Sequence, residues 1–243
     1  MKTPAIGFAI PCLNERDNVP VLLREIADVM GRAGLDYEIV VTDDASTDGT
    51  WEVLKGLAAA DSRLRIQRFA RNQGESAASI AAAQATRAPI VVTIDSDLQN
   101  DPADLPKFLA AIENADCVCG SRVVSRARGD NMLKRAISWA ANRVRAWVLD
   151  DPISDAGCTY RAFRRACLAD LPMFDGAHRF IPVVLAWRGF RVVEVPVNNR
   201  ERRSGKSHYG LFTRIGAIGD MFALRWMKGR LVDLKIAERF PKE

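Results

Sequence analysis

The chain has 243 residues, 48% of them hydrophobic, and a net charge of +5 at neutral pH. This length and composition support one sizeable core, so we expect one main folded domain rather than two. The mild positive charge is compatible with an anionic small molecule, an anionic membrane or a nucleic acid, and selects none of them.

The cysteine pattern excludes the usual structural zinc site, because there is no CxxC pair and the chain has only two histidines. Reduced thiols in a cytosolic compartment are the simplest interpretation. We also expect no secretory leader and no bilayer-spanning segment, since no apolar run reaches 18 residues. The cysteines are Cys12, Cys117, Cys119, Cys158 and Cys167.

The first hundred residues alternate between short apolar runs and amphipathic stretches. The run 90–94 contains four β-branched aliphatic residues and is typical of a strand buried on both faces. Such alternation predicts an open parallel α/β sheet. The expected strands are 6–10, 37–42, 64–69 and 90–94, and the expected helices are 18–33, 50–60 and 75–87.

The second half continues with fewer clear elements. We expect a strand over 116–120, a helix over 178–188 and a last strand over 191–197. His178 opens that helix, and a histidine in this position is more often structural than catalytic.

Acidic and amide side chains follow three of the predicted strands. Asp95, Asp97 and Gln99 come directly after the strand 90–94, and in an extended chain alternate residues share a face. Their oxygen atoms suit Mg²⁺ or Mn²⁺, with substrate phosphates completing the coordination shell. The alternative is a solvated turn with acidic helix-capping residues. The other two acidic or amide pairs are Asn14 with Glu15 and Asp43 with Asp44.

Ligands of open α/β sheets bind outside the carboxyl ends of the strands. The chain has neither a G-x-G-x-x-G after its first strand nor a G-x-x-x-x-G-K-[ST] anywhere, so the common dinucleotide and P-loop modes are disfavoured. The remaining mode is a nucleoside diphosphate that a metal ion holds against the carboxylates. Its base and ribose would lie near the first two loops.

Arginines follow the later strands. Arg122 comes after the strand 116–120, and Arg200 and Arg202 come after the strand 191–197. Guanidinium groups match phosphate oxygens, and Gly205 with Lys206 would allow a loop to close over an anion. The alternative, a solvated basic face, applies most to Arg126, Arg128 and Arg203.

Together these segments resemble the inverting family 2 glycosyltransferases of GT-A fold, in the branch of dolichyl- or polyprenyl-phosphate sugar synthases. The resemblance spans roughly residues 5–210, with its motifs in order and at the expected spacing. The motifs are Pro11-Cys-Leu-Asn14-Glu15, Asp43-Asp44-x-Ser46-x-Asp48-Gly-Thr50, Asp95-x-Asp97-Leu98-Gln99, Gly120-Ser121-Arg122, Asp155-x-Gly157-Cys158-x-x-Arg161 and Arg200-x-Arg202-x-x-Gly205-x-Ser207.

The resemblance implies a GT-A α/β fold: a Rossmann-like, mostly parallel open sheet flanked by helices, with a C-terminal amphipathic helix. It also implies metal-dependent transfer of a sugar from a nucleotide diphosphate sugar, GDP-mannose or a UDP-sugar, to a polyprenyl monophosphate. It assigns Mg²⁺ or Mn²⁺ to Asp95, Asp97 and Gln99, and the main catalytic roles to Asp97, Arg122 and Arg202. Donor contacts fall on Pro11, Leu13, Asn14, Glu15, Thr42, Asp44, Asp95 and Ser96, and acceptor-phosphate contacts on Arg122, Arg200, Arg202 and Lys206.

A phosphate acceptor is already ionised at neutral pH and needs no general base, whereas a hydroxyl acceptor does. The first alternative is therefore transfer to a lipid or glycan hydroxyl, for which Asp155 is the candidate base. A second alternative is a non-catalytic binder of a nucleotide sugar or nucleic acid. We expect no nucleic-acid partner, because no aromatic–basic interleaving or known module is present.

Two segments have the composition of in-plane membrane helices. Residues 131–149 and 208–232 carry apolar stripes at 3–4 residue spacing with lysine, arginine and tryptophan alongside. Core packing is the ordinary alternative. We expect a catalytic domain over 1–207 and a basic amphipathic segment over 208–243, peripheral on the cytoplasmic face of a membrane. The pattern defines neither the sugar and base nor the oligomeric state.

Overall fold

The computed structural model describes residues 3–126, 142–169, 171, 174–200 and 211–230. The chain divides into two units, 1–208 and 209–243.

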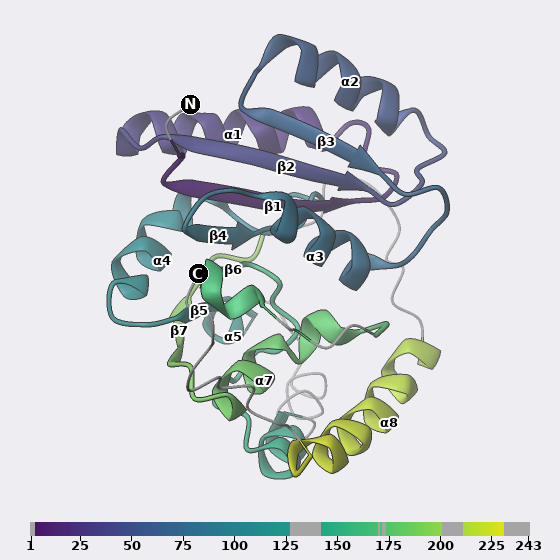
Figure 1. The fold of residues 1–243 in the computed structure, drawn as a ribbon, viewed down its shortest axis with the longest axis vertical. Coiled ribbons are helices and arrows are strands. Elements are labelled where there is room, and N and C mark those ends of the chain that lie inside the picture. Colours follow the sequence, from purple (N-terminus) through teal and green to yellow (C-terminus); the bar gives the residue numbers. More distant parts are fainter. Residues whose placement is uncertain (1–2, 127–141, 170, 172–173, 201–210, 231–243) are drawn as a thin grey trace, which may run out of the picture. The chain divides into compact units, whose positions relative to one another are not determined.

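The first unit is built on one seven-stranded sheet with the strand order β3-β2-β1-β4-β6-β5-β7 (Figure 1). β1 pairs in parallel with β2 and β4, β2 with β3, and β5 with β7. Among the strands that the structure describes, only β6, between β4 and β5, runs antiparallel to its neighbours. The mostly parallel open sheet predicted from the sequence is therefore confirmed. The strands are β1 (Ile6–Cys12), β2 (Tyr37–Asp43), β3 (Leu64–Arg68), β4 (Ile90–Thr93), β5 (Cys117–Ser121), β6 (Arg161–Arg164) and β7 (Val192–Pro196).

The helices of the first unit agree with the predicted periodicity in its first half. The predicted bounds of the three helices expected there lie within two residues of the observed bounds. The sequence did not predict α4 or β6. β6 has only four residues, too few for a clear alternating pattern. The helices are α1 (Val19–Ala33), α2 (Thr50–Ala60), α3 (Glu75–Ala85), α4 (Leu105–Ile112), α5 (Val123–Arg126) and α7 (Ile181–Trp187), with 3₁₀ turns η1 (Pro102–Asp104), η2 (Arg165–Leu168) and η3 (Ala177–Arg179). Residues 142–149 are also helical.

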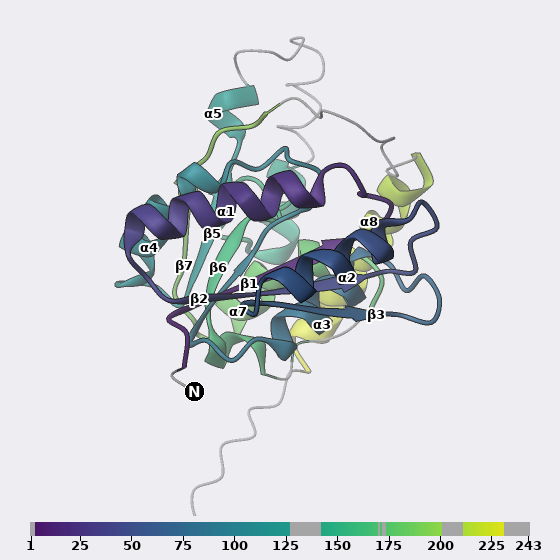
Figure 2. The ribbon, with the colours of Figure 1, turned by 90° about the horizontal axis from the view of Figure 1, so that it is seen from above.

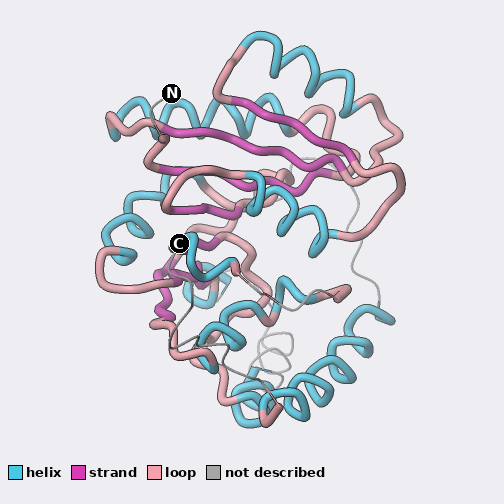
Figure 3. The backbone as a smooth tube through the Cα atoms, viewed as in Figure 1, coloured by secondary structure: helices cyan, strands magenta, loops and turns pink. Residues whose placement is uncertain are grey.

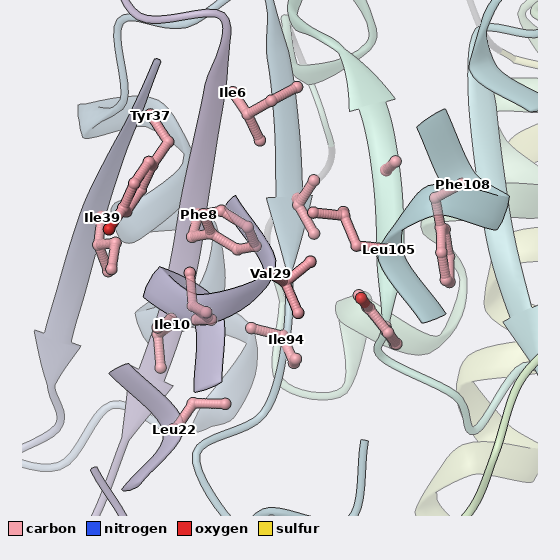
Figure 4. Packing of buried hydrophobic residues seen from close by; sticks show 14 of the residues in the cluster. Ile6, Phe8, Ile10, Leu22, Val29, Tyr37, Ile39, Ile94, Leu105 and Phe108 are labelled. Atoms are coloured by element: carbon pink, nitrogen blue, oxygen red, sulfur yellow. The ribbon is translucent and has the colours of Figure 1, made fainter. Parts of the chain in front are cut away.

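The sheet is buried on both faces because its strands carry apolar residues at consecutive positions. Phe8 and Ile10 pack on one face, with residues of α1, α2 and α4, and Ala9 between them packs on the other, with residues of α3 and α7. Figure 2 shows α1 and α3 on opposite sides of the strands. Leu22 and Val29 of α1 share one buried cluster with Ile39 and Ile94 (Figure 4). Continuous apolar runs are typical of such central parallel strands.

A glycine allows α3 to lie close to β1. A Cβ atom on Gly7 would be 2.9 Å from Cβ of Thr86, at the end of α3. Any larger residue there would force the helix off the sheet, because no real Cβ atom approaches another carbon so closely. This close packing sets the position of α3, whose first residue lies at the candidate site.

The second unit contains α8 (Leu211–Lys228). Phe222 and Trp226 are exposed, and the Arg230 guanidinium lies 4.1 Å from the centre of the Trp226 ring. The side chains of Leu211, Ile215 and Ile218, which complete the predicted stripe, lie outside the described residues. In the part of the chain that the structure describes, no helix combines the length and apolar character needed to cross a membrane.

Candidate active site

The loops after β1 and β2 lie at the carboxyl end of the sheet (Figure 3). Hydrogen bonds join the two loops. Asn14, whose φ of 56° is left-handed, receives a hydrogen bond on Oδ1 from the Thr47 amide at 2.8 Å. Its own amide donates to Ser46 Oγ at 2.8 Å, and the Glu15 amide donates to Thr50 Oγ1 at 3.0 Å. The two loops predicted to contact the donor thus form one hydrogen-bonded surface.

β1 is two residues longer than predicted. Pro11 and Cys12 continue the strand in register with Thr42 and Asp43, although a proline was expected to end it. Proline lacks the amide proton but keeps its carbonyl, and Pro11 O accepts a 2.9 Å hydrogen bond from Ser96 Oγ. This bond ties the acidic segment after β4 to the end of β1.

The acidic segment is a turn and not an extended strand, which corrects the sequence-based expectation. Leu98 has a φ of 64° and is buried in the core, and the chain bends there, after a turn at Ser96 and Asp97. The Gln99 amide donates to Asp97 Oδ1 at 3.0 Å, and Thr159 Oγ1 donates to Asp95 Oδ2. A buried leucine therefore fixes a turn whose acidic side chains the alternation rule placed on one face of a strand.

Negative charge accumulates at this turn. Burial, reinforced by repulsion from Glu75 and from Asp97, raises the pKa of Asp95 to about 8. A divalent cation would relieve that repulsion, and the available donors are oxygen atoms, which Mg²⁺ and Mn²⁺ prefer. Within the described residues, no three histidine, cysteine or acidic side chains could hold a metal ion together. The site fits an ion that shares its coordination shell with substrate phosphates.

Two predicted donor contacts have other partners. Asp44 is buried and accepts hydrogen bonds from the amides of Gln73 at 2.7 Å and Gly74 at 2.9 Å. Burial raises the pKa of Asp44, and the two amides oppose that shift. Thr42 is fully buried and accepts from Gln67 Nε2 at 2.8 Å. Both side chains hold neighbouring segments of the site in place.

Arg122, at the end of β5, forms a bidentate ion pair with Asp155. Nε lies 2.9 Å from Oδ2, Nη2 lies 3.0 Å from Oδ1, and the Arg122 amide donates to Oδ2 at 3.0 Å. Burial alone would lower the pKa of Arg122, but the hydrogen bonds and charge of Asp155 more than offset it and raise the pKa. A Cβ atom on Gly157 would be 3.3 Å from Nη2, so glycine leaves room for the guanidinium.

The segment 155–159 connects this pair to the acidic turn. The Asp155 amide donates to Glu194 Oε1 at 3.1 Å, and Thr93 Oγ1 donates to the Thr159 carbonyl at 2.6 Å. Thr159 in turn donates a hydrogen bond to Asp95. The positive charge of Arg122 lowers the pKa of Asp95 and so opposes part of its upward shift. The predicted metal and phosphate residues Asp95 and Arg122 therefore belong to one site.

Arg200 has a different environment from the one predicted. Its Nη1 lies 2.7 Å from Glu25 Oε2 and its Nη2 2.5 Å from Asp101 Oδ1. Burial would lower the pKa of Arg200, but its bonds to Glu25 and Asp101 raise it. This arginine bridges α1 to the residue before η1, and both of its terminal nitrogens are already engaged by carboxylates.

The chain after β7 nevertheless passes the acidic turn. The Arg200 amide donates to the Gln99 carbonyl at 2.9 Å, beside a bridge between Asn100 and Asn199, and the Asn198 amide donates to Asp104 Oδ2 at 2.7 Å. Arg202 and Lys206, predicted to bind the acceptor phosphate, lie outside the described residues. The last described residue before them, Arg200, is held at the acidic turn through its backbone amide.

The sequence-based assignment missed Glu75 and Ser76, the first residues of α3. Ser76 Oγ lies 2.7 Å from His178 Nδ1, and Glu75 Oε1 lies 3.6 Å from His178 Nε2. Burial lowers the pKa of His178 to about 4, so its imidazole is neutral at pH 7. Glu75 follows the loop after β3, and its place beyond the carboxyl end of a parallel strand is a signal that could have identified it.

Solved structures with this GT-A fold include two synthases named for sugar-linked phosphoglycerates. Mannosyl-3-phosphoglycerate synthase from Rubrobacter xylanophilus has a TM-score of 0.70 at 20% identity, over 96% of this chain and 78% of that one. Glucosyl-3-phosphoglycerate synthase from Mycobacterium tuberculosis, in complex with Mn²⁺, UDP-glucose and phosphoglyceric acid, has a TM-score of 0.63 at 21% identity, over 98% and 84%. At this level of identity the likeness establishes the fold alone.

The family model for glycosyl transferase family 2 matches residues 8–171, and the chain belongs to that family. Similar curated proteins include the undecaprenyl-phosphate 4-deoxy-4-formamido-L-arabinose transferases of Aeromonas hydrophila, 31% identical over 218 residues, and Edwardsiella ictaluri, 30% identical over 217. Each match covers 89% of this chain, which spans 66% of the length of these relatives. The predicted family is confirmed.

Proposed function

We propose that this protein transfers a sugar from a nucleotide diphosphate sugar to a polyprenyl monophosphate with inversion of the anomeric centre. Membership of glycosyl transferase family 2 and the similarity to undecaprenyl-phosphate transferases support this reaction class. The observation that carries the proposal is the Arg122–Asp155 pair beside the acidic turn.

That pair distinguishes between two kinds of acceptor. A hydroxyl acceptor requires a carboxylate free to remove a proton. Asp155, the candidate base, instead accepts three hydrogen bonds from Arg122, with only 7% of its side chain exposed. An ionised phosphate needs no base and benefits from a positioned guanidinium. The geometry therefore favours a phosphate acceptor.

On the donor side, we assign Mg²⁺ or Mn²⁺ to Asp97 and Asp95, with Gln99 at the edge of the turn. When bound, such an ion would neutralise the charge that develops on the departing nucleoside diphosphate. The joined loops containing Pro11, Leu13, Asn14 and Glu15, with Ser96 hydrogen-bonded to Pro11, would hold the base and ribose. Asp44 contributes indirectly, by fixing the loop that leads into α3.

On the acceptor side, Arg122 and Arg202 would position the lipid phosphate, with Lys206 completing the charge. Asp155 holds the Arg122 guanidinium in one orientation, so less side-chain freedom is lost when phosphate binds. We assign Arg200 a supporting role, because its ion pairs with Glu25 and Asp101 anchor the backbone from which Arg202 follows.

We further propose that the protein attaches peripherally to the cytoplasmic face of a membrane. Seven large apolar residues are exposed in the described part of the chain, and only Leu35 lies outside the segments that flank or belong to the two predicted membrane regions. Basic groups beside exposed aromatic rings suit an anionic leaflet, as in the Arg230–Trp226 contact. The other six are Val123, Val124, Val144, Trp147, Phe222 and Trp226.

The direct test is a donor panel with one short polyprenyl phosphate as acceptor, with and without Mg²⁺ or Mn²⁺. The expected result is metal-dependent formation of a lipid-linked sugar phosphate from one nucleotide sugar. A matched reaction with the dephosphorylated polyprenol should give no product. Transfer to the polyprenol at a similar rate would contradict the phosphate assignment and restore the hydroxyl-acceptor alternative.

A further inference from the structure

The antiparallel direction of β6 brings the segment before it to the carboxyl edge of the sheet. β6 begins at Arg161, which pairs with Thr93, the last residue of β4. The residues that precede a parallel strand lie at the opposite edge, whereas the residues that precede an antiparallel strand lie at the carboxyl ends of its parallel neighbours. Residues 155–160 therefore reach the candidate site because β6 runs against the rest of the sheet.

The register of the β4–β6 pairing places Thr159 opposite Asp95. The two strands pair without a bulge up to Thr93 and Arg161. Asp95 and Thr159 each lie two residues beyond that last pair, so continued pairing sets them opposite each other on one face. The hydrogen bond that Thr159 Oγ1 donates to Asp95 Oδ2 agrees with this register.

The backbone of Thr159 is held from both neighbouring strands. Its carbonyl accepts a 2.6 Å hydrogen bond from Thr93 Oγ1 of β4. The carbonyl of the next residue, Tyr160, accepts a 2.9 Å hydrogen bond from the Gly120 amide of β5. A Cβ atom on Gly120 would be 3.1 Å from that carbonyl oxygen, so glycine permits the close approach. The position of the Thr159 hydroxyl is therefore fixed by contacts that do not involve Asp95.

This hydroxyl restricts the carboxylate of Asp95. Thr159 is β-branched, which limits its rotamers, and its one hydroxyl proton is donated to Oδ2. A fixed donor on one oxygen sets the orientation of the planar carboxylate, and so the direction in which the other oxygen is presented. Removing a hydrogen-bond partner of this kind from a ligating carboxylate typically costs roughly 10- to 100-fold in metal affinity.

We propose that Thr159 is a positioning residue for the donor: its hydroxyl holds Asp95 in the orientation that binds the divalent cation and, through it, the diphosphate. The inference rests on the proposed function, which assigns that cation to the acidic turn. The same segment, 155–159, holds Arg122 through Asp155. One short segment thus orients a residue of the donor side at one end and a residue of the acceptor side at the other.

The test measures nucleotide binding by calorimetry with and without Mn²⁺, using whichever of UDP and GDP the wild-type protein binds more tightly. Thr159→Val keeps the β-branched shape and removes the hydroxyl. It should reduce the gain in affinity that Mn²⁺ provides by about tenfold, or abolish it, while affinity without Mn²⁺ changes by less than about twofold. Thr159→Ser keeps the hydroxyl and should retain the Mn²⁺ effect within about threefold.

Thr86→Val is the matched control, because Thr86 Oγ1 also donates a buried hydrogen bond, to the Ala83 carbonyl at 2.7 Å. Thr86 lies beside Gly7 near the start of β1, at the other edge of the sheet, so the Mn²⁺ effect should be unchanged. Thermal unfolding shows whether each variant is folded. Should Thr159→Val unfold, Thr159→Ala removes the same hydroxyl and must show the same loss.

An unchanged Mn²⁺ effect in the folded variant that lacks the hydroxyl would overturn the inference. Equal losses in Thr159→Val and Thr159→Ser, or equal losses with and without Mn²⁺, would also overturn it, because the shape of the side chain would then be responsible. A wild-type affinity that Mn²⁺ does not raise would overturn both the inference and the metal assignment. Mn²⁺-dependent binding that requires Thr159, without transfer to polyprenyl phosphate, would contradict the proposed function and leave the inference standing.

Discussion

Arg122 and Asp155 are joined side by side, with Nε–Oδ2 and Nη2–Oδ1 distances of 2.9 and 3.0 Å and side-chain exposures of 11% and 7%. In this geometry the carboxylate cannot approach a hydroxyl without releasing the guanidinium. Asp155 therefore acts as the residue that positions Arg122. The same pair makes the interior of the site sensitive to loss of either charge, because a lone buried ion is costly.

Replacing Asp155 by Asn should lower both stability and acceptor affinity. The free energy of unfolding should fall by about 3 kcal/mol, since the charge of Arg122 loses its partner, and KM for polyprenyl phosphate should rise. Urea denaturation and steady-state kinetics measure the two effects. The double variant with Arg122→Gln should lose less stability than the sum of the single variants.

Asp61→Asn is the surface control for this pair, since the Arg63–Asp61 bridge has side-chain exposures of 50% and 36%. It should cost about 1 kcal/mol or less. If Asp155→Asn abolished turnover while acceptor binding and stability remained at wild-type values, Asp155 would be a general base.

Asp97→Ala should abolish turnover and metal-enhanced nucleotide binding while preserving the fold. The side chain belongs to the turn after β4 and not to the apolar core, and losing charge stabilisation of the leaving group should cost several kcal/mol in the barrier. Nucleotide binding with and without Mn²⁺ gives the readout, with exposed Asp17→Ala as control. Activity within about tenfold of wild type, or ~1.4 kcal/mol, would refute the metal assignment.

Arg200→Ala and Arg202→Ala should have different effects. Loss of the bridge from Arg200 to Glu25 and Asp101 should reduce the free energy of unfolding by about 1–2 kcal/mol, because the guanidinium is only partly buried. Arg202→Ala should weaken use of the lipid phosphate far more than nucleotide binding, and Lys should rescue it only in part. Should Arg202→Ala reduce nucleotide affinity equally, Arg202 belongs to the donor side.

The buried imidazole of His178 should make stability depend on pH. Its folded pKa of about 4 lies below the ordinary value of 6.5, so between these values the unfolded chain binds a proton that the folded chain does not. The contribution of His178 to the free energy of unfolding is fully present above pH 6.5 and declines as the pH falls toward 4. Between pH 7 and 5 this contribution should fall by about 2 kcal/mol.

His178→Asn isolates this contribution, since the Asn oxygen can accept the Ser76 hydroxyl in place of Nδ1. The raised pKa of Asp95 makes stability fall as the pH rises over part of this pH range, which is the opposite of the His178 effect. This contribution is the same in the wild-type protein and the variant. Chemical denaturation at several pH values should show a flatter profile for the variant. Parallel profiles would contradict the assignment of a neutral buried His178.

Simultaneous replacement of Phe222 and Trp226 by Ala should reduce binding to anionic vesicles. Both side chains are about 60% exposed, so their loss should not change thermal stability. Binding of the wild-type protein should also weaken as salt rises, because charge attraction is screened within roughly 8 Å at physiological ionic strength. An unchanged, stable variant that still floats with vesicles would refute the anchor.

The sequence by itself determined the fold class, the family and the order of the functional loops. Apolar runs such as 90–94 and the stripe in α1 are local patterns, so they predict which residues are buried even when the packing partners are unknown. The acidic motif after β4 and the arginine after β5 could likewise be assigned, because parallel strands place their carboxyl ends at one edge of the sheet.

Only the tertiary structure decided what each charged side chain contacts. Asp155 pairs with Arg122 across 33 positions, Arg200 bridges Glu25 across 175, and Ser76 bonds His178 across 102. Such pairings depend on which loops lie next to each other in space. Residues of the same type therefore bind a ligand, anchor a backbone segment or only lie beside the site, depending on which loops are adjacent. The turn at Leu98 was equally hidden, because burial of one leucine in the core outweighed the local preference for an extended chain.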